Sequence, residues 1–297
     1  MSLKKFVVKR LNEYSFKSKE ARFVAAMQRI NNDEVLKVDI EGDEVNFAHT
    51  GHLGDIIYSL PAVYKLAEGR KINYYFHLNR TFQYPNRMSH PNGNILMTEK
   101  NVELIQPLLL HQPEINKCEA YSGQPIHYEL DIFRKYPFDY RMGSIARWYF
   151  IIYGINSDLG KSWLTVTPDT SVSDAIIVAR SSRYHTPGIS YSFLKKYPRV
   201  VFVGLPAEYE EMKSAIPNLE YKPVKNYFEL AAVIAGGKFF IGNQSSPFAV
   251  AEGLKVKRVL EMYYQVPNVM VEGANGYDFC MQPQFEKIVA NLYEQKF

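Results

Sequence analysis

The second half of the chain alternates apolar and amphipathic segments, and this alternation limits the fold more than any other feature. Five segments rich in Val, Ile and Phe read as strands: AIIVARSS, RVVFVG, LEYKPV, KFFIGN and KRVLEMY. The segments between them, SYSFLKKY, AEYEEMKSAI, YFELAAVIAGG and SPFAVAEGL, read as helices. Such strands in alternation with helices are typical of a parallel sheet that is covered on both faces. We therefore predict an α/β domain with a doubly wound sheet, whose ligands lie beyond the carboxyl ends of its strands.

The first half shows the same kinds of element less regularly. We expect a helix near the start, then two short strands in LKVDIEGDEVNFA joined by a hairpin turn at 41–43. A strand–loop–helix unit follows, then a strand in KINYYFHLN, a helix in VELIQPLLLHQ that Pro107 breaks, and a helix in SIARWYFIIYGI that Gly154 closes. The polar segment 156–174 reads as a linker. The predicted organisation is an N-terminal domain over 1–160, a C-terminal domain over 174–280 and a last amphipathic helix over 281–297.

Composition excludes several classes of protein. With 46% hydrophobic and 22% charged residues, the chain has the composition of a soluble globular protein. A net charge of +4 without a basic-aromatic motif argues against a nucleic-acid binder. Cys118 and Cys280 lie far apart and lack metal-type spacing, so we expect neither a disulfide framework nor a metal site. The chain has neither a secretory signal nor an apolar run of membrane-spanning length, which favours a cytoplasmic location.

Basic residues gather near the start of the chain and are interleaved with apolar ones. They are Lys4, Lys5, Lys9, Arg10, Lys17 and Lys19. This pattern is typical of a solvated helix face, and it also suits a surface that lies on an anionic membrane or a charged glycan. Peripheral association with the inner face of a membrane therefore stays open.

The segment FAHTGHLGDII reads as a strand, a tight loop and the start of a helix. Gly51 and Gly54 let the backbone turn and leave its amides unobstructed. The helix should begin near Asp55 and bend or restart at Pro61, with Ser59 as a candidate cap. Amides at a helix start favour anionic groups, so the loop can face an anion in a cleft. Asp55 is then either a helix cap or a reactive carboxylate.

The second half contains a matching corner in FFIGNQSSPFAVAEGL. Small polar residues separate a buried strand from a helix that starts near Pro247. Such a corner can hold a phosphate group without a Walker lysine, which is absent. The residues of this corner are Gly242, Asn243, Gln244, Ser245 and Ser246.

Both corners resemble motifs of one enzyme family. GHLGDIIYSLPAVYKL resembles the N-terminal signature of heptosyltransferase-type glycosyltransferases (family 9), and FIGNQSSPFAVAEGLKVKRVLEM resembles the donor-phosphate loop and helix of that family. The resemblance implies the GT-B fold, in which two doubly wound, Rossmann-like domains face a cleft and the last helix often crosses back to the first domain. It also implies inverting transfer of a sugar from a nucleotide diphosphate-sugar to a glycan or lipid-linked acceptor such as a lipopolysaccharide, with no essential metal and no other cofactor.

The resemblance also assigns roles to residues. Asp55 matches the aspartate that serves as general base, although a helix N-terminus stabilises a carboxylate and thereby weakens it as a base. His49, Thr50, Gly51, His52 and Gly54 would form the acceptor or phosphate loop around it, and the plain interpretation of the two histidines is hydrogen bonding within the loop. ARSSRYHTPGISY resembles the loop that contacts the donor pyrophosphate, and Gly204 and Glu208 are candidates for the base and ribose. The expected donor-binding residues are Arg180, Ser181, Ser182, Arg183, Gly204, Glu208, Gly242, Asn243, Gln244, Ser245 and Ser246.

The second corner departs from the family pattern. Members usually carry Asp-Thr-Gly or Asp-Ser-Gly followed by His, whereas this chain has Asn243, Gln244 and Ser245, and Phe248 stands where the His would be. We expect a metal-independent glycosyltransferase with Asp55 as its base. The alternatives are a catalytically silent nucleotide- or sugar-binding protein of the same fold, and a nucleotide-sugar epimerase or hydrolase.

Overall fold

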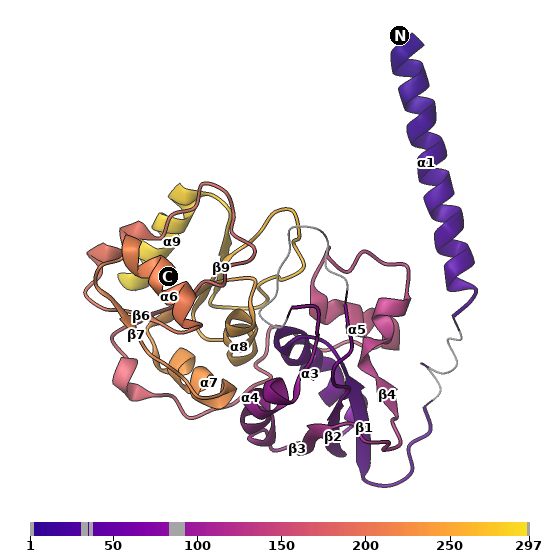
Figure 1. Cartoon of the computed structure of the whole chain (residues 1–297), viewed down its shortest axis with the longest axis horizontal. Coiled ribbons are helices and arrows are strands. Elements are labelled where there is room, and N and C mark those ends of the chain that lie inside the picture. The colour runs from indigo at the N-terminus through magenta and orange to yellow at the C-terminus, as the bar shows by residue number, and fades with distance from the viewer. Residues whose placement is uncertain (1–2, 31–34, 36–37, 83–92, 296–297) are drawn as a thin grey trace.

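A computed structural model describes residues 3–30, 35, 38–82 and 93–295, and it has two parallel sheets side by side (Figure 1). The first sheet has the order β3-β2-β1-β4. Its strands are β1 (Glu44–His49), β2 (Lys71–Phe76), β3 (Ile115–Ala120) and β4 (Tyr128–Glu129), and every pairing is parallel. The second sheet has the order β10-β9-β8-β5-β6-β7 and is also parallel. Its strands are β5 (Ile176–Ala179), β6 (Val200–Phe202), β7 (Leu219–Tyr221), β8 (Phe239–Asn243), β9 (Arg258–Glu261) and β10 (Gly276–Phe279).

Helices cover both sheets, as the alternating pattern predicts. The first domain contains α3 (Leu53–Ala67), α4 (Glu99–Leu110), the 3-10 helix η1 (Leu130–Lys135) and α5 (Ile145–Tyr153). The second contains η2 (Thr170–Val172), η3 (Ser192–Lys196), α6 (Pro206–Ala215), α7 (Tyr227–Gly236), α8 (Ser246–Leu254) and α9 (Gln282–Tyr293). The predicted architecture of two Rossmann-like domains is therefore confirmed.

The domains meet through two pairs of helices. Helix α3 packs against α8, and α4 packs against α7. One apolar core runs from Phe47 of β1 through Ile57 of α3 to Phe248 of α8 and Leu260 of β9. A second core lies on the far face of the second sheet, under η3 and α9. Because the first core is continuous across the interface, the starts of α3 and α8 are held close together.

Several local expectations were wrong. Residues 38–40 are irregular, so there is no hairpin before β1, which pairs in parallel with β2 and β4. Helices α3 and α4 continue through Pro61 and Pro107. Ser59 is not a cap: its hydroxyl donates to the Ile56 carbonyl at 2.7 Å and lies 2.7 Å from the Tyr74 hydroxyl. SYSFLKKY forms only a short 3-10 helix, η3.

The last helix differs from the expectation as well. Phe285, Val289 and Leu292 of α9 belong to the core of the second sheet, and the Phe285 ring stacks on Phe279 of β10 with 3.9 Å between centroids. Helix α9 therefore packs on its own domain instead of crossing back to the first. The apolar face of α9 packs against β10, the strand that immediately precedes it in the chain.

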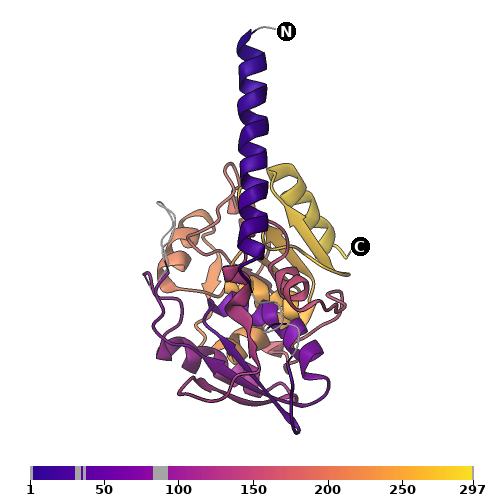
Figure 2. The same cartoon turned by 90° about the vertical axis from the view of Figure 1, so that its right-hand side faces the viewer.

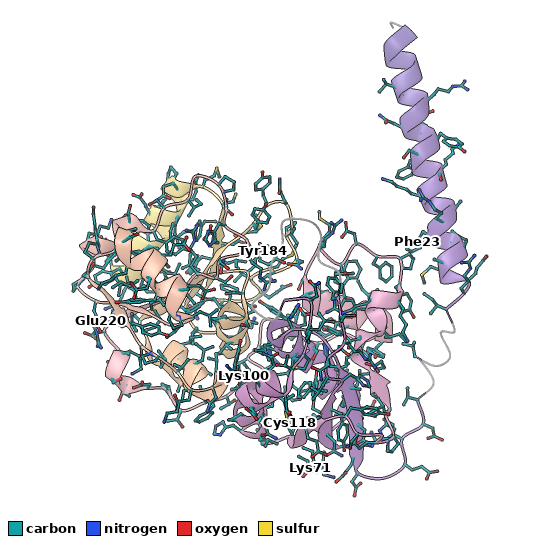
Figure 3. The ribbon with its side chains drawn as sticks, viewed as in Figure 1. Phe23, Lys71, Lys100, Cys118, Tyr184 and Glu220 are labelled. Carbon is teal, nitrogen blue, oxygen red and sulfur yellow. The ribbon has the colours of Figure 1, made fainter. Side chains whose placement is uncertain are left out.

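Helix α1 (Leu3–Met27) projects away from both domains, which two perpendicular views show (Figures 1 and 2). In Figure 3, Phe23 lies near the foot of this helix, and its ring contacts Phe138 at 5.9 Å between centroids. None of the helices described is both long enough and apolar enough to cross a membrane.

Candidate functional site

The site lies where α3 and α8 begin. Each helix follows the carboxyl end of a central strand, β1 or β8, so both starts lie at the edge where ligands of such sheets bind. The two starts are close: a Cβ added to Gly54 would lie 3.6 Å from the Cα of Ser246. Gly51 is required by packing, because a Cβ there would lie 2.4 Å from His49 Cε1 and 2.9 Å from Asp55 Cβ. The two corners recognised in the sequence therefore face one another.

Two adjoining cavities of about 140 Å³ and 550 Å³ open between the domains. The smaller cavity is lined by Gly54 from the first corner and by Gln244, Ser245 and Ser246 from the second. The larger cavity extends along the first domain, over the segment 137–141 that follows η1. Both cavities are lined by His52, Asp55, Leu96, Ile145, Arg183, Tyr184 and Asn268.

Asp55 caps α3, and its side chain also lines the cleft. It is the third residue of α3, and its Oδ2 accepts the His52 backbone N–H at 3.3 Å, as a helix cap does. The same Oδ2 accepts a 2.6 Å hydrogen bond from Arg134 Nη2, and the side chain, 19% exposed, lines both cavities. The carboxylate thus closes the helix end and faces the cleft.

Arg134 is the main site residue that the sequence analysis missed. It lies in η1, directly after the two-residue strand β4, and its Nε donates to Asp131 Oδ1 at 3.2 Å. Burial opposes its charge, but Asp55 and Asp131 outweigh burial and raise the pKa of Arg134. Burial also opposes the charge of Asp131, whose pKa is nevertheless lowered by His49, Arg134 and the Thr50 N–H that it accepts. A fixed cation therefore sits beside the Asp55 carboxylate.

His49 and His52 support the loop as neutral side chains. His49 Nδ1 accepts the Gly51 N–H at 2.7 Å, so its Nε2–H donates to the Tyr149 hydroxyl at 2.8 Å. That hydroxyl donates in turn to the Asp55 carbonyl at 3.3 Å. Burial lowers the pKa of His49, and burial lowers the pKa of His52 to about 4, so both imidazoles are uncharged at neutral pH. The hydrogen-bonding interpretation of His49 fits the geometry.

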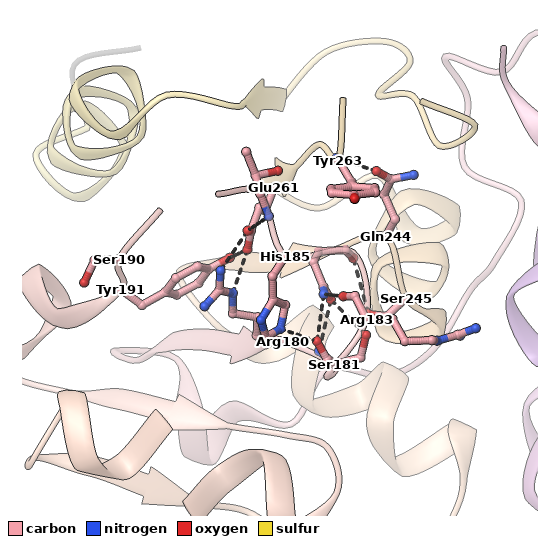
Figure 4. Close-up of polar contacts among 12 residues, drawn as sticks. Arg180, Ser181, Arg183, His185, Ser190, Tyr191, Gln244, Ser245, Glu261 and Tyr263 are labelled. Atoms are coloured by element: carbon pink, nitrogen blue, oxygen red, sulfur yellow. Dashed lines mark hydrogen bonds and ion pairs between the residues drawn. The ribbon is translucent and has the colours of Figure 1, made fainter. Parts of the chain in front are cut away.

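In the second corner, Asn243 and Gln244 hold neighbouring loops. The buried Asn243 amide donates to the carbonyls of Ser181 at 2.9 Å and Arg183 at 2.5 Å, and its oxygen accepts the Ser181 N–H at 3.0 Å. Gln244 donates to the Val266 carbonyl at 2.7 Å and accepts the Tyr263 N–H at 2.5 Å. Figure 4 shows Gln244 beside Tyr263, and Ser181 and Arg183 of the 180–185 loop beside Ser245. The Asn243 and Gln244 side chains therefore hold in place the loops 181–183 and 263–266 beside the cleft.

The two arginines of the 180–183 loop differ in their surroundings. Arg180 donates two hydrogen bonds, of 2.7 and 2.8 Å, to the fully buried Glu261, and it stacks on Tyr191. Arg183 forms no ion pair with any carboxylate described, and it lines both cavities. In Figure 4 its side chain extends away from the hydrogen-bonded cluster. Arg183 is therefore the cation that this loop presents to the cleft.

The remaining candidates lie further from the cavities. Glu208 accepts the N–H groups of Ser182 at 3.2 Å and Leu205 at 3.1 Å, so it joins the start of α6 to the loop. Gly204 and Glu208 line neither cavity, and Gly242 is packed against the Phe240 ring. Ser246 shares a 2.5 Å hydrogen bond with Tyr227. Across the described ranges, no group of three or more His, Cys, Asp or Glu side chains is placed to hold a metal ion.

Comparison with known proteins supports the architecture. No protein-family model and no curated protein matches the sequence. Among solved structures, E. coli heptosyltransferase WaaC with ADP matches with a TM-score of 0.54 and 11% identity, over 84% of this chain and 99% of that one. WaaC with ADP-2-deoxy-2-fluoro heptose matches with a TM-score of 0.53 and 11% identity, over 86% of this chain and 100% of that one.

A third structure is the iron-containing dodecameric glycosyltransferase TibC from enterotoxigenic E. coli H10407, with a TM-score of 0.50 and 15% identity. That match covers 79% of this chain and 63% of TibC. At these identities the likeness concerns architecture. The chain has the two-domain GT-B fold of the heptosyltransferase-like, family 9 glycosyltransferases.

Proposed function

We propose that the protein transfers a sugar from a nucleoside diphosphate-sugar to a saccharide hydroxyl, with inversion and with Asp55 as general base. One observation carries the proposal: the Asp55 carboxylate of the first domain and the Arg183 guanidinium of the second line the same two cavities, beside the start of α8. A base and a site for an anionic leaving group are the two elements that such a transfer needs.

The proposed step balances as a single displacement. Asp55 accepts the proton of an acceptor hydroxyl while that oxygen attacks the anomeric carbon, and the bond from this carbon to the diphosphate oxygen breaks. Among the described residues, both hydrogen bonds of the Asp55 side chain go to Oδ2, so the acceptor approaches Oδ1. The nucleoside diphosphate leaves with the bonding electrons, and Arg183 and the Ser246 backbone N–H at the start of α8 stabilise its charge. Because these groups are fixed in the chain, we propose that no metal or other cofactor is needed.

Donor and acceptor occupy different cavities in this proposal. The smaller cavity, beside the α8 start, suits the diphosphate, and the larger one, along 137–141, suits the acceptor saccharide. WaaC was solved with ADP and with an ADP-heptose analogue, so we propose a nucleotide-sugar of this class as the first donor to test. A glycan or lipopolysaccharide-like saccharide is the corresponding acceptor.

The test combines calorimetry with detection of released nucleotide over a panel of nucleotide-sugars, for the native protein and for Asp55→Asn. The substitution should leave donor binding unchanged and lower turnover by roughly 10²–10⁴-fold. Ser182→Ala is a matched control, because its side chain lines neither cavity. The absence of nucleotide binding by the native protein would contradict the proposal.

A silent binding protein is the second candidate, and a specific observation favours it. Arg134 Nη2 donates to Asp55 Oδ2 at 2.6 Å, so an ion pair already occupies one oxygen of the proposed base. Nucleotide binding with no turnover on any acceptor would establish this alternative. Release of free sugar with water as the acceptor would instead indicate a nucleotide-sugar hydrolase.

A further inference from the structure

Helix α1 carries the positive charge of the whole protein. Its 25 residues include seven Lys or Arg and two Glu, which makes its net charge +5, whereas the entire chain has +4 and the remainder therefore −1. From Val8 to Ala25, every described side chain is exposed except Ser18, which is half-buried. Along these described positions the helix has no packed face, and its contacts with the rest of the protein lie at its foot.

The basic residues share the helix with large apolar side chains that face solvent. Phe16 is 63% and Tyr14 77% exposed, and Val8 and Val24 are each about half exposed. Lys9, Asn12, Phe16, Lys19 and Phe23 follow one another at intervals of three and four residues, so they lie on one side of the helix. We call this side, defined by those five residues, the Lys–Phe stripe.

The stripe ends at the acceptor side of the cleft. Phe23 contacts Phe138, and Phe138 lines the larger cavity. Met27, one turn beyond Phe23, and Ile30 pack against the core and fix the foot of the helix. The Lys–Phe stripe therefore starts beside the larger cavity and runs away from it along α1. At 1.5 Å per residue, the 25 residues of α1 span about 37 Å.

We infer that α1 docks on a bilayer surface containing anionic lipids and so holds the larger cavity beside that surface. Charge complementarity selects this partner, because lysines attract an anionic leaflet while Phe16 and its apolar neighbours enter the interface. A second copy of the chain is disfavoured, because two α1 helices would bring +5 against +5 and the remainder offers only −1. The exposed apolar side chains favour lipid over nucleic acid, whose backbone attracts cations alone.

Vesicle flotation of the full chain tests the docking without any donor or acceptor. The native protein should bind vesicles of phosphatidylcholine mixed with phosphatidylglycerol and not vesicles of phosphatidylcholine alone, and binding should weaken as salt is raised. Replacing Lys9, Lys17, Lys19 and Arg22 together by Gln should weaken binding roughly a thousandfold, because each cation contributes independently near the surface. Gln keeps the helix propensity of Lys and Arg, so circular dichroism should not change.

The matched control replaces four exposed lysines of the two domains, Lys65, Lys117, Lys161 and Lys195, by Gln. It makes the same change in net charge and should leave vesicle binding within about twofold of native, because these four lysines lie outside α1. Phe16→Ala should weaken the part of the binding that persists at high salt. Equal losses in both quadruple variants, or no binding of the native protein to the anionic vesicles, would overturn the inference.

Two other outcomes also decide against it. Binding to duplex DNA with none to anionic vesicles would assign α1 to nucleic acid, and an α1-dependent dimer in light scattering would assign it to a second copy. Calorimetry with a nucleotide on the same preparations separates this inference from the proposed transfer. Nucleotide binding without vesicle binding refutes the docking alone, and vesicle binding without nucleotide binding refutes the transfer alone.

Discussion

Arg134 Nη2 lies 2.6 Å from Asp55 Oδ2, and this hydrogen-bonded ion pair joins η1 to the start of α3. Arg134 also donates to Asp131, and Asp131 accepts the Thr50 N–H in the loop after β1. The proposed base is therefore held by three elements of the first domain at once. A carboxylate held in this way is oriented before a substrate arrives.

Removing Arg134 should lower the stability of the protein. Arg134→Gln leaves Asp55 and Asp131 without their shared cation in a site where all three side chains are less than a fifth exposed. We expect a loss of roughly 3 kcal/mol in the free energy of unfolding, measured by urea denaturation. Arg134→Lys should recover part of it, because the charge returns without the fork geometry.

The control for this change lies a few residues along the chain. Arg141 pairs with Asp139 through bonds of 2.8 and 2.9 Å, but both side chains are at least half exposed. Arg141→Gln should therefore change the free energy of unfolding by less than about 1 kcal/mol. Equal losses in the free energy of unfolding at the two positions would show that the Arg134 ion pair contributes no more than an exposed surface pair.

Replacing Arg183 should weaken nucleotide binding, whereas replacing Arg180 should lower stability. Arg183→Gln removes the cation facing both cavities and should weaken nucleoside diphosphate binding by roughly 10–100-fold, with little change in stability. Arg180→Gln leaves the buried Glu261 without its cation and should lower the free energy of unfolding by roughly 3 kcal/mol. Calorimetry with a nucleoside diphosphate and urea denaturation on both variants measure the contrast. If the Arg183 variant bound as well as native protein, the diphosphate would have to lie elsewhere.

The sequence was most informative where a local pattern decides the structure. The apolar strands β5, β6, β8 and β9 are almost fully buried, and both strand-to-helix corners lie at the cleft. The hairpin prediction rested on the residues at 41–43, which are typical of a turn. It failed because β1 pairs instead with β2 and β4, which follow it later in the chain and whose position a local pattern does not reveal. The short strands β3, β4 and β10 were missed because they carry too few apolar residues to show a period.

Site residues were harder to predict for a related reason. Arg134 reaches Asp55 across 79 residues of sequence, and only the fold places η1 against the start of α3. Arg180 and Arg183 belong to one polar loop, and which of them meets a buried carboxylate depends on Glu261 of β9. The signal available for Arg134 was the spacing of Asp131 and Arg134, which puts both on one side of a helical turn.

Acid should destabilise the loop around Asp55 through its two buried histidines. The pKa values of His49 and His52 lie below 6.5 in the folded protein because burial disfavours their charged forms. The unfolded chain therefore binds more protons below pH 6.5, and stability present above that pH is lost as the pH falls towards 4. The loss is at most about 1.4 kcal/mol per pH unit for each histidine.

Urea denaturation at several pH values, for the native protein and for His49→Gln, measures this contribution. The variant should be less stable at pH 7.5 because it loses the bond to Tyr149, but its stability should fall less steeply between pH 6.5 and 5. His111→Gln removes a histidine from an exposed position and serves as the control. If the stability of His49→Gln and of the native protein fell equally steeply with pH, protonation of His49 would not destabilise the fold.

Restoring the aspartate typical of the family should harm this chain. Asn243 donates through its amide to the carbonyls of Ser181 and Arg183, and a carboxylate in its place cannot donate and would repel both oxygens. Asn243→Asp should therefore lower the free energy of unfolding by roughly 2 kcal/mol and weaken nucleotide binding, because Arg183 loses its support. Ser245→Ala removes only a 3.3 Å contact of the same corner and should leave the free energy of unfolding nearly unchanged. If Asn243→Asp instead raised turnover without loss of stability, residue 243 would contact the donor directly and the 181–183 loop would be held by other groups.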